Sequence, residues 1–123
     1  ILMIISIHQP QYIPWLPYFM KIEKSDLFVF LDSVDFQKNG LQNRNAIKTA
    51  QGRHWLTIPI NHRSGQKISQ TTINNKLNWK KKHWFTLKSC YEKSEFFEIY
   101  EPYLGSFFEF EWENLRDLNI VLT

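Results

Sequence analysis

Two short apolar runs, separated by a segment rich in proline, constrain the fold of this chain more than any other feature. The first run covers Leu2–Ile7 and the second covers Leu27–Leu31, and both have the length and composition of buried strands. Between them, Tyr18–Lys24 has the composition of a short helix, and Pro17 suits its first turn because no partner is needed there for a backbone N–H. The pattern predicts a strand–helix–strand unit with parallel strands.

Polar side chains follow both predicted strands. His8, Gln9 and Gln11 come after the first strand, and Asp32 and Asp35 come after the second. Because ligands of parallel sheets bind beyond the carboxyl ends of the strands, we expect the functional site at this edge. His8 is the predicted acid or base, since imidazole exchanges protons near neutral pH, and Asp32 is the predicted catalytic partner that orients it. The amides of Gln9 and Gln11 suit contacts with a sugar or a base edge.

Each of these residues also has a structural interpretation. His8 could fix the loop by hydrogen bonding, Gln11 could brace the same loop, and Asp32 could cap the next turn. Asp32 could instead hold a metal ion or accept a hydrogen bond from a ribose hydroxyl. The Asp32 and Asp35 pair is a weak metal signal, and one cysteine with four scattered histidines does not form a zinc site. No resident metal is predicted, the cofactor is unspecified, and Mg²⁺ is expected only if the reaction uses ATP.

The distribution of charge is more informative than its total. The formal net charge is +3, but 11 Lys and Arg and no Asp or Glu fall between Gln37 and Tyr91. Eight of the 12 acidic residues follow that stretch. The asymmetry predicts an anionic partner such as a phosphate, a nucleotide or a nucleic acid, unless the acidic tail folds across the basic middle and neutralises it.

Arg44 is the strongest candidate for binding that anion, because the amides of Asn43 and Asn45 flank it. A guanidinium binds phosphate or carboxylate in a bidentate manner, and neighbouring amides can complete such a site. Lys48 lies four residues further along, in the predicted strand that follows Arg44, and could point to the same face because positions four apart share a strand face. The alternative is that Arg44 is a surface residue paired with an acid from the tail.

After the second strand, the pattern predicts three further strands and then three helices. The strands are expected at Asn45–Thr49, His54–Ile60 and Ile68–Ile73, and the helices at 79–93, 96–107 and 112–122. Gly52 lies in the expected hairpin loop, and Asn78 is the expected N-cap of the first helix. Residues 1–123 are thus predicted to form a single α/β domain. We expect a Rossmann-like parallel or mixed sheet that starts with the strand–helix–strand unit, followed by a β-hairpin and C-terminal helices.

The aromatic residues and the lone cysteine bear on burial and compartment. Trp15 lies in the proline-rich loop and is the one tryptophan expected to contact substrate, whereas the other four and Cys90 are expected in the core. Cys90 cannot form an internal disulfide, which fits a reducing compartment such as the cytoplasm. No apolar run approaches the ~20 residues that span a bilayer, so membrane insertion is not expected.

The segment IHQPQYIPWL at Ile7–Leu16, followed by FVFLD at Phe28–Asp32 and QNRN at Gln42–Asn45, resembles the WbqC-like protein family. The segment Trp55–Ile60 also fits, and the resemblance covers nearly the whole chain. It implies a bacterial protein linked to the synthesis of surface polysaccharide (O-antigen), with an aminoacyl or glycyl transfer to an amino sugar. Because family members are longer, it also implies that this chain is an N-terminal fragment.

Some positions depart from the family pattern. Pro17 stands where the family usually has glycine, which excludes a positive φ there and supports a helix start. Ser33 and Asp35 stand where we expect Asp and Gln, and Leu41 stands where we expect Trp. These departures weaken the assignment of Asp35 to the site but leave Asp32 unaffected.

Together these observations predict an enzyme that transfers an aminoacyl, glycyl or similar group to a nucleotide-linked amino sugar. The partner would be a phosphate-bearing small molecule, with Arg44 and Lys48 neutralising its phosphates. A nucleotidyltransferase-like enzyme is an alternative that rests on fold analogy. A nucleic-acid-binding module is a further alternative, and it is less expected because no nucleic-acid motif is present. No sequence feature specifies an oligomeric state.

Overall fold

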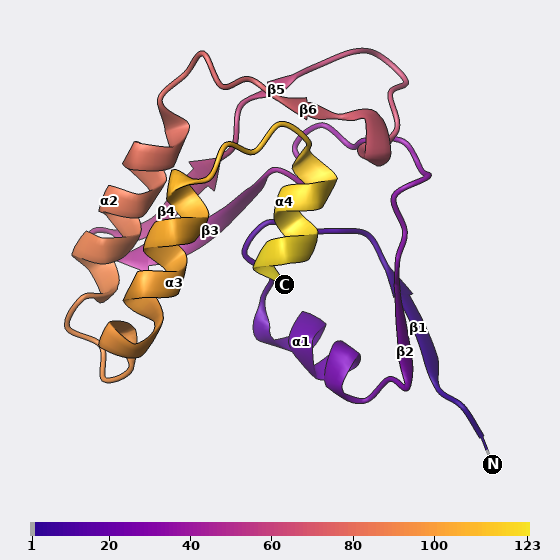
Figure 1. Ribbon diagram of the computed structural model, residues 1–123, viewed down its shortest axis with the longest axis horizontal. Coiled ribbons are helices and arrows are strands. Elements are labelled where there is room, and N and C mark those ends of the chain that lie inside the picture. Colours follow the sequence, from indigo (N-terminus) through magenta and orange to yellow (C-terminus); the bar gives the residue numbers. More distant parts are fainter. Residues whose placement is uncertain (1) are drawn as a thin grey trace.

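The computed structural model describes residues 2–123, which form a mixed α/β arrangement of three two-stranded sheets and four α-helices (Figure 1). The elements in chain order are β1 (Ile5–His8), α1 (Leu16–Glu23), β2 (Leu27–Phe30), β3 (Arg44–Thr49), β4 (Gly52–Thr57), β5 (Ile60–Asn61), the 3-10 helix η1 (Ile68–Gln70), β6 (Thr72–Ile73), α2 (Trp79–Tyr91), α3 (Phe97–Glu109) and α4 (Leu115–Leu122).

The strand–helix–strand unit is confirmed. β1 and β2 pair in parallel, with Ile5 opposite Leu27 and His8 opposite Phe30. The crossover contains α1, which has a proline in its first turn as predicted. Tyr18 of α1 is buried, and its ring lies 5.6 Å from the ring of Phe28. One face of this parallel pair is therefore covered by its own crossover helix.

The prediction that both strands are buried is wrong. Four apolar side chains on the face away from α1 are 38–55% exposed, namely Ile5, Ile7, Leu27 and Val29. Parallel strands are fully buried only where both faces are covered, and α1 covers one. The predicted Rossmann-like sheet is likewise not confirmed, because the described residues form three separate pairs of strands, and β1–β2 lies at one side of the molecule (Figure 1).

The predicted hairpin is confirmed with a tighter turn. β3 and β4 are antiparallel, with Arg44 opposite Thr57 and Thr49 opposite Gly52. The connection is Ala50–Gln51, and Gly52 has a φ of +102°, a conformation that disfavours side chains. Side chains alternate between the two faces of the hairpin, so those of Ile47 and Leu56 point into the core and those at the positions between them point outward.

The segment predicted as a strand at Ile68–Ile73 instead forms η1 and only the short strand β6. The backbone N–H groups of Ile68 and Ser69 donate to the carbonyls of Val34 and Asp32, at 2.9 Å each. These bonds tie the segment to the chain leaving β2, so it does not extend a ladder. Ile68 is completely buried, which anchors the turn.

The three C-terminal helices form as predicted, with shifted boundaries. Asn78 occupies the N-cap of α2 without a side-chain capping bond, and Gly105 lies inside α3 without ending it. α4 begins at Leu115 because the side chain of Asn114 caps it, accepting a hydrogen bond from the N–H of Asp117 at 3.2 Å. Among the described residues, no helix has the length and hydrophobicity needed to cross a membrane.

Cys90 is exposed, and the prediction that it is buried is wrong. The residues before it in the last turn of α2, Lys88 and Ser89, are exposed as well. In this turn Leu87 and Tyr91 pack against the main core, while Trp79 and His83 are buried near the start of the helix. Cys90 was expected to be buried because cysteine usually is and because aromatic residues surround it in sequence, but it lies on the side of α2 that faces solvent.

The loop between β1 and α1 is held to the hairpin by Asn45. The Nδ2 of Asn45 donates to the carbonyls of Tyr12, at 3.2 Å, and Ile13, at 2.7 Å. Its Oδ1 accepts from the N–H of Ala46 at 2.8 Å. Ile13 has a φ of +46°, which costs energy for a β-branched residue and needs external support. Asn45 was predicted to bind substrate, and these contacts give it a structural role.

Replacing Asn45 with alanine is expected to lower the free energy of unfolding by about 2 kcal/mol, because two loop carbonyls lose their donor. Urea denaturation followed by circular dichroism measures this change. Gln51→Ala, at the exposed hairpin turn, is the control and should change the value by less than about 0.5 kcal/mol. An Asn45→Ala variant as stable as the wild type would show that the loop does not depend on this side chain.

Candidate functional site

His8 lies at the carboxyl end of β1, at the predicted edge. Its Nδ1 is 3.2 Å from the Nζ of Lys21, and its Nε2 is 3.2 Å from the side-chain nitrogen of Gln11. Its ring packs edge-on against Tyr18, with the centroids 4.7 Å apart. Burial, and secondarily the charge of Lys21, lowers the pKa of His8. The imidazole is therefore neutral at pH 7 and has the protonation state of a base.

Asp32 lies at the same edge but has a different partner. Its Oδ2 accepts from Nη1 of Arg116, on α4, at 2.9 Å. Arg116 also contacts Asp117, and these two carboxylates raise its pKa. Among the described residues no hydrogen bond joins His8 to Asp32, so an orienting role for Asp32 stays a prediction. Lys21 and Arg116, which contact His8 and Asp32, were not predicted from the sequence.

A network of buried amides continues this edge. Gln42 donates from Nε2 to the Oε1 of Gln9 at 2.7 Å, and Asn119 donates from Nδ2 to the carbonyl of Gln42 at 2.7 Å. Gln42 and Asn119 are buried. Three buried side-chain oxygens have no hydrogen-bond partner within the described part of the chain, namely those of Gln11, Gln42 and Asn119. Such atoms are rare in folded proteins and suit a group rich in hydrogen-bond donors.

The sequence carried a signal for Asn119 that was not used. Asn119 falls on the same helical face as Leu115 and Leu118, which are completely buried. A polar residue at a core position needs a partner, so its position pointed to a buried network. Gln42 belongs to the QNRN segment but was not singled out within it.

The remaining predicted residues lie apart from His8. Trp15 is 64% exposed at the start of α1. Asp35 is exposed and forms an ion pair with Lys67. Asn43 is buried, and its Nδ2 donates to the carbonyl of Ile58 at 2.9 Å. Lys48 is exposed on β3.

Arg44 borders a cavity of about 280 Å³ beside the start of β3. Its Nη2 donates to the carbonyl of Asn39 at 3.0 Å, and its Cζ lies 4.4 Å from the ring centroid of Trp55. Its Nε is buried and has no hydrogen-bond partner in the described residues. Lys38 and His62 also line the cavity, and its lining contains no carboxylate. The arrangement can bind an anion, but the neighbouring amides of Asn43 and Asn45, which were expected to complete the site, donate to backbone carbonyls instead.

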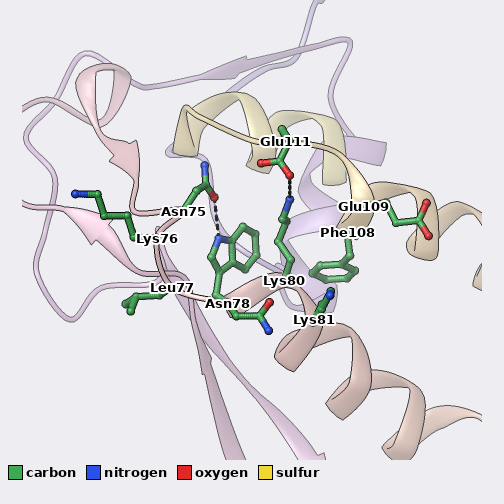
Figure 2. A pocket seen from close by; sticks show the side chains of 10 residues that line it. Asn75, Lys76, Leu77, Asn78, Lys80, Lys81, Phe108, Glu109 and Glu111 are labelled. Atoms are coloured by element: carbon green, nitrogen blue, oxygen red, sulfur yellow. Dashed lines mark hydrogen bonds and ion pairs between the residues drawn. The ribbon is translucent and has the colours of Figure 1, made fainter.

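A second cavity, of about 400 Å³, lies at the start of α2 and is less suited to an anion (Figure 2). Lys80 lines it but is paired with Glu111 at 2.7 Å, and Glu109 lies at the same rim (Figure 2). Trp79 donates from Nε1 to the Oδ1 of Asn75 at 3.1 Å, which closes the inner wall. Lys80 is thus balanced by an acid from the tail, which was the alternative considered for the basic middle of the chain.

Within the described residues, no three His, Cys, Asp or Glu side chains gather in a way that could hold a metal ion. The two candidate regions are therefore the amide-rich edge beside His8 and the cavity beside Arg44. They lie on either side of the loop at Gln37–Asn43, since Gln42 contacts Gln9 while Asn43 lines the cavity.

Comparison with known proteins identifies relatives of this chain. The family model described as the WbqC-like protein family matches residues 9–123. The protein named "Uncharacterized protein Rv1507c" from Mycobacterium tuberculosis is 37% identical over 118 residues, which cover 94% of this chain and 51% of that protein. The chain thus spans about half the length of this relative. No solved structure matches.

Proposed function

This chain belongs to the WbqC-like protein family, and on that premise we propose that it binds a nucleotide-linked sugar in bacterial surface-polysaccharide synthesis. The proposed reaction is transfer of an aminoacyl, glycyl or similar group to an amino sugar. The proposed pathway rests on membership of this family, because some members are encoded with enzymes of O-antigen synthesis. The substrate class rests on two regions. The cavity beside Arg44 suits a phosphate, and the amide-rich edge beside His8 suits a sugar.

The observation that carries the proposal is the environment of Arg44. A buried Nε without a protein partner, beside Lys38 in a cavity that contains no carboxylate, favours an anionic ligand. Contacts with Asn39 and Trp55 hold the guanidinium in one orientation. A fixed guanidinium loses little conformational entropy when phosphate binds, which supports a specific site.

The amide-rich edge beside His8 supports the sugar half of the proposal. Sugar hydroxyls and an amino group are donors, and the partly exposed side chains of Gln9 and Gln11 offer amide oxygens as acceptors at this edge. When the amine of the sugar attacks an activated acyl donor, the amide bond forms as the bond to the donor's leaving group breaks. The proton of the amine then passes to the one unprotonated ring nitrogen of the neutral His8, which gives up its contact with Lys21 or Gln11. His8 is thus the proposed general base, with Lys21 and Gln11 positioning its ring.

Replacing Arg44 with glutamine is expected to weaken binding of UDP-N-acetylglucosamine about tenfold, because a charge-assisted contact with phosphate is lost. Isothermal titration calorimetry with the wild type and the variant measures the change. Lys24→Gln removes an exposed positive charge at the end of α1, away from the cavity, and should leave affinity unchanged. Absence of a heat signal for the wild type at millimolar ligand, with UDP and GDP sugars alike, would count against a nucleotide-sugar function.

A further inference from the structure

The outward face of the β3–β4 hairpin carries Arg44 together with two further cations, Lys48 and Arg53, that lie outside the cavity beside Arg44. By the strand register, Arg44, Lys48, Arg53 and Trp55 share this face, since Lys48 lies opposite Arg53 and Trp55 lies opposite Ala46. We call these four residues the hairpin face. Sequence reasoning found Arg44 and Lys48 but assigned Trp55 to the core and overlooked Arg53.

The charges of the hairpin face lack partners of opposite sign. In the described part of the chain, the ion pairs involve Lys67, Lys80, Lys88 and Arg116, and none involves Arg44, Lys48 or Arg53. Like charges directly opposite on paired strands destabilise a hairpin, and Lys48 faces Arg53 in this way. A purely structural face would gain from a carboxylate here, so the arrangement favours an anionic ligand.

Trp55 lies between two basic hollows. It is 41% exposed, with the Cζ of Arg44 at 4.4 Å and that of Arg53 at 5.7 Å from its ring centroid. The cavity beside Arg44 borders one end of this face, and a hollow of about 360 Å³ that includes Lys48 and Arg53 borders the other. The Cα atoms of Arg44 and Lys48 are roughly 13 Å apart for four residues of strand. The guanidinium groups of Arg44 and Arg53 nevertheless approach the same Trp55 ring, so adjacent phosphates can contact cations from both ends of the face.

We propose that the hairpin face binds the nucleoside diphosphate portion of the substrate, with its cations on the phosphates and Trp55 beside the nucleoside. A ligand for this face must be extended, carry more than one negative charge and offer a flat ring, and a nucleoside diphosphate meets all three requirements. The inference rests on the proposed function and names the part of the substrate that the hairpin recognises. Arg53 and Trp55 join Lys48 and Arg44 in binding that part of the substrate.

The test is titration of UDP against the whole chain and single variants of the hairpin face, by calorimetry and tryptophan fluorescence. Arg53→Gln is expected to weaken UDP binding about tenfold, and Lys48→Gln less, because a lysine makes a more flexible contact. Trp55→Phe should remove most of the fluorescence change on UDP binding while the far-UV circular dichroism stays unchanged. Uridine without phosphate should not compete, and Lys24→Gln should bind UDP as the wild type does.

Three outcomes would overturn the inference, and they separate it from the proposed function. If Arg44→Gln weakens UDP binding while the Lys48, Arg53 and Trp55 variants do not, the hairpin role is wrong and the phosphate site stands. If the wild type does not bind UDP at millimolar concentration, both are wrong. If a 12-nucleotide deoxythymidine strand binds more tightly than UDP, with a logarithmic salt slope of about −2 for three neutralised phosphates, the face binds nucleic acid instead.

Discussion

Replacing Leu118 with alanine is expected to lower the free energy of unfolding by about 3 kcal/mol. Leu118 is completely buried, as is Leu115 one turn earlier on α4, and both belong to the main core. The substitution removes apolar contacts and leaves a cavity, and surrounding helices relax only in part. Urea denaturation at pH 7 provides the measurement, since the midpoint should fall without a change in slope.

The consequence for the candidate site follows from the position of α4. This helix brings Arg116 to Asp32 and Asn119 to Gln42, so it closes the carboxyl edge of β1–β2. Loosening α4 should therefore weaken ligand binding at the edge as well as stability. Val121→Ala is the matched control, because Val121 lies on the same helix but is 51% exposed and should change stability by less than about 0.5 kcal/mol. Equal losses in both variants would mean that α4 is not anchored by its buried face.

The sequence predicted the strand–helix–strand unit because local patterns determine it. The apolar runs around Ile5 and Val29, with a proline-rich crossover between them, permit few other pairings. The same runs did not predict burial, since whether a strand face is covered depends on segments distant in sequence. Ile68 shows the same dependence on distant segments, because the hydrogen bond from its backbone N–H to the carbonyl of Val34 overrides its strand propensity.

For the candidate site, as for the fold, local sequence patterns predicted some features but not the contacts between distant segments. The rule that ligands bind at the carboxyl ends of parallel strands located His8 and Asp32 at the edge. It did not reveal that Arg116, 84 positions further along the chain, would take the carboxylate of Asp32. Trp55 was assigned to the core because tryptophan is usually buried, and only the strand register shows that it points outward. Long-range pairings of this kind are set by tertiary packing, which a single sequence does not display.

Acid is expected to destabilise the protein through His83, by about 3 kcal/mol between pH 7 and pH 4. The Nε2 of His83 donates to the carbonyl of Thr57 at 3.1 Å, so the Nδ1 accepts from the hydroxyl of Tyr12 at 2.8 Å. Burial lowers the pKa of His83 to about 4, and the charge of nearby His54 adds to the shift, whereas the bond to Thr57 opposes it. The imidazole is thus held neutral in the folded state.

The sign of the effect follows from proton uptake. In the unfolded chain the pKa of this histidine returns to 6.5, so between pH 6.5 and about pH 4 the unfolded state binds a proton that the folded state does not. Stability is complete above pH 6.5, falls as the pH drops through that window, and stops depending on His83 below about pH 4. Because Tyr12 lies in the same loop as Gln9 and Gln11, protonation should also loosen the loop that contributes to the candidate site.

The measurement is the difference in unfolding free energy between the wild type and His83→Gln at a series of pH values, because the other titrating groups cancel in that difference. The wild type should be the more stable at pH 7, since the variant leaves the Tyr12 hydroxyl or the Thr57 carbonyl without its partner. The advantage should shrink by about 3 kcal/mol as the pH falls to 4. Gln51→Ala, at the exposed hairpin turn, should change the unfolding free energy by less than about 0.5 kcal/mol at every pH in the series. An advantage that stays constant from pH 7 to pH 4 would mean that His83 is not held neutral and that the acid sensitivity has another source.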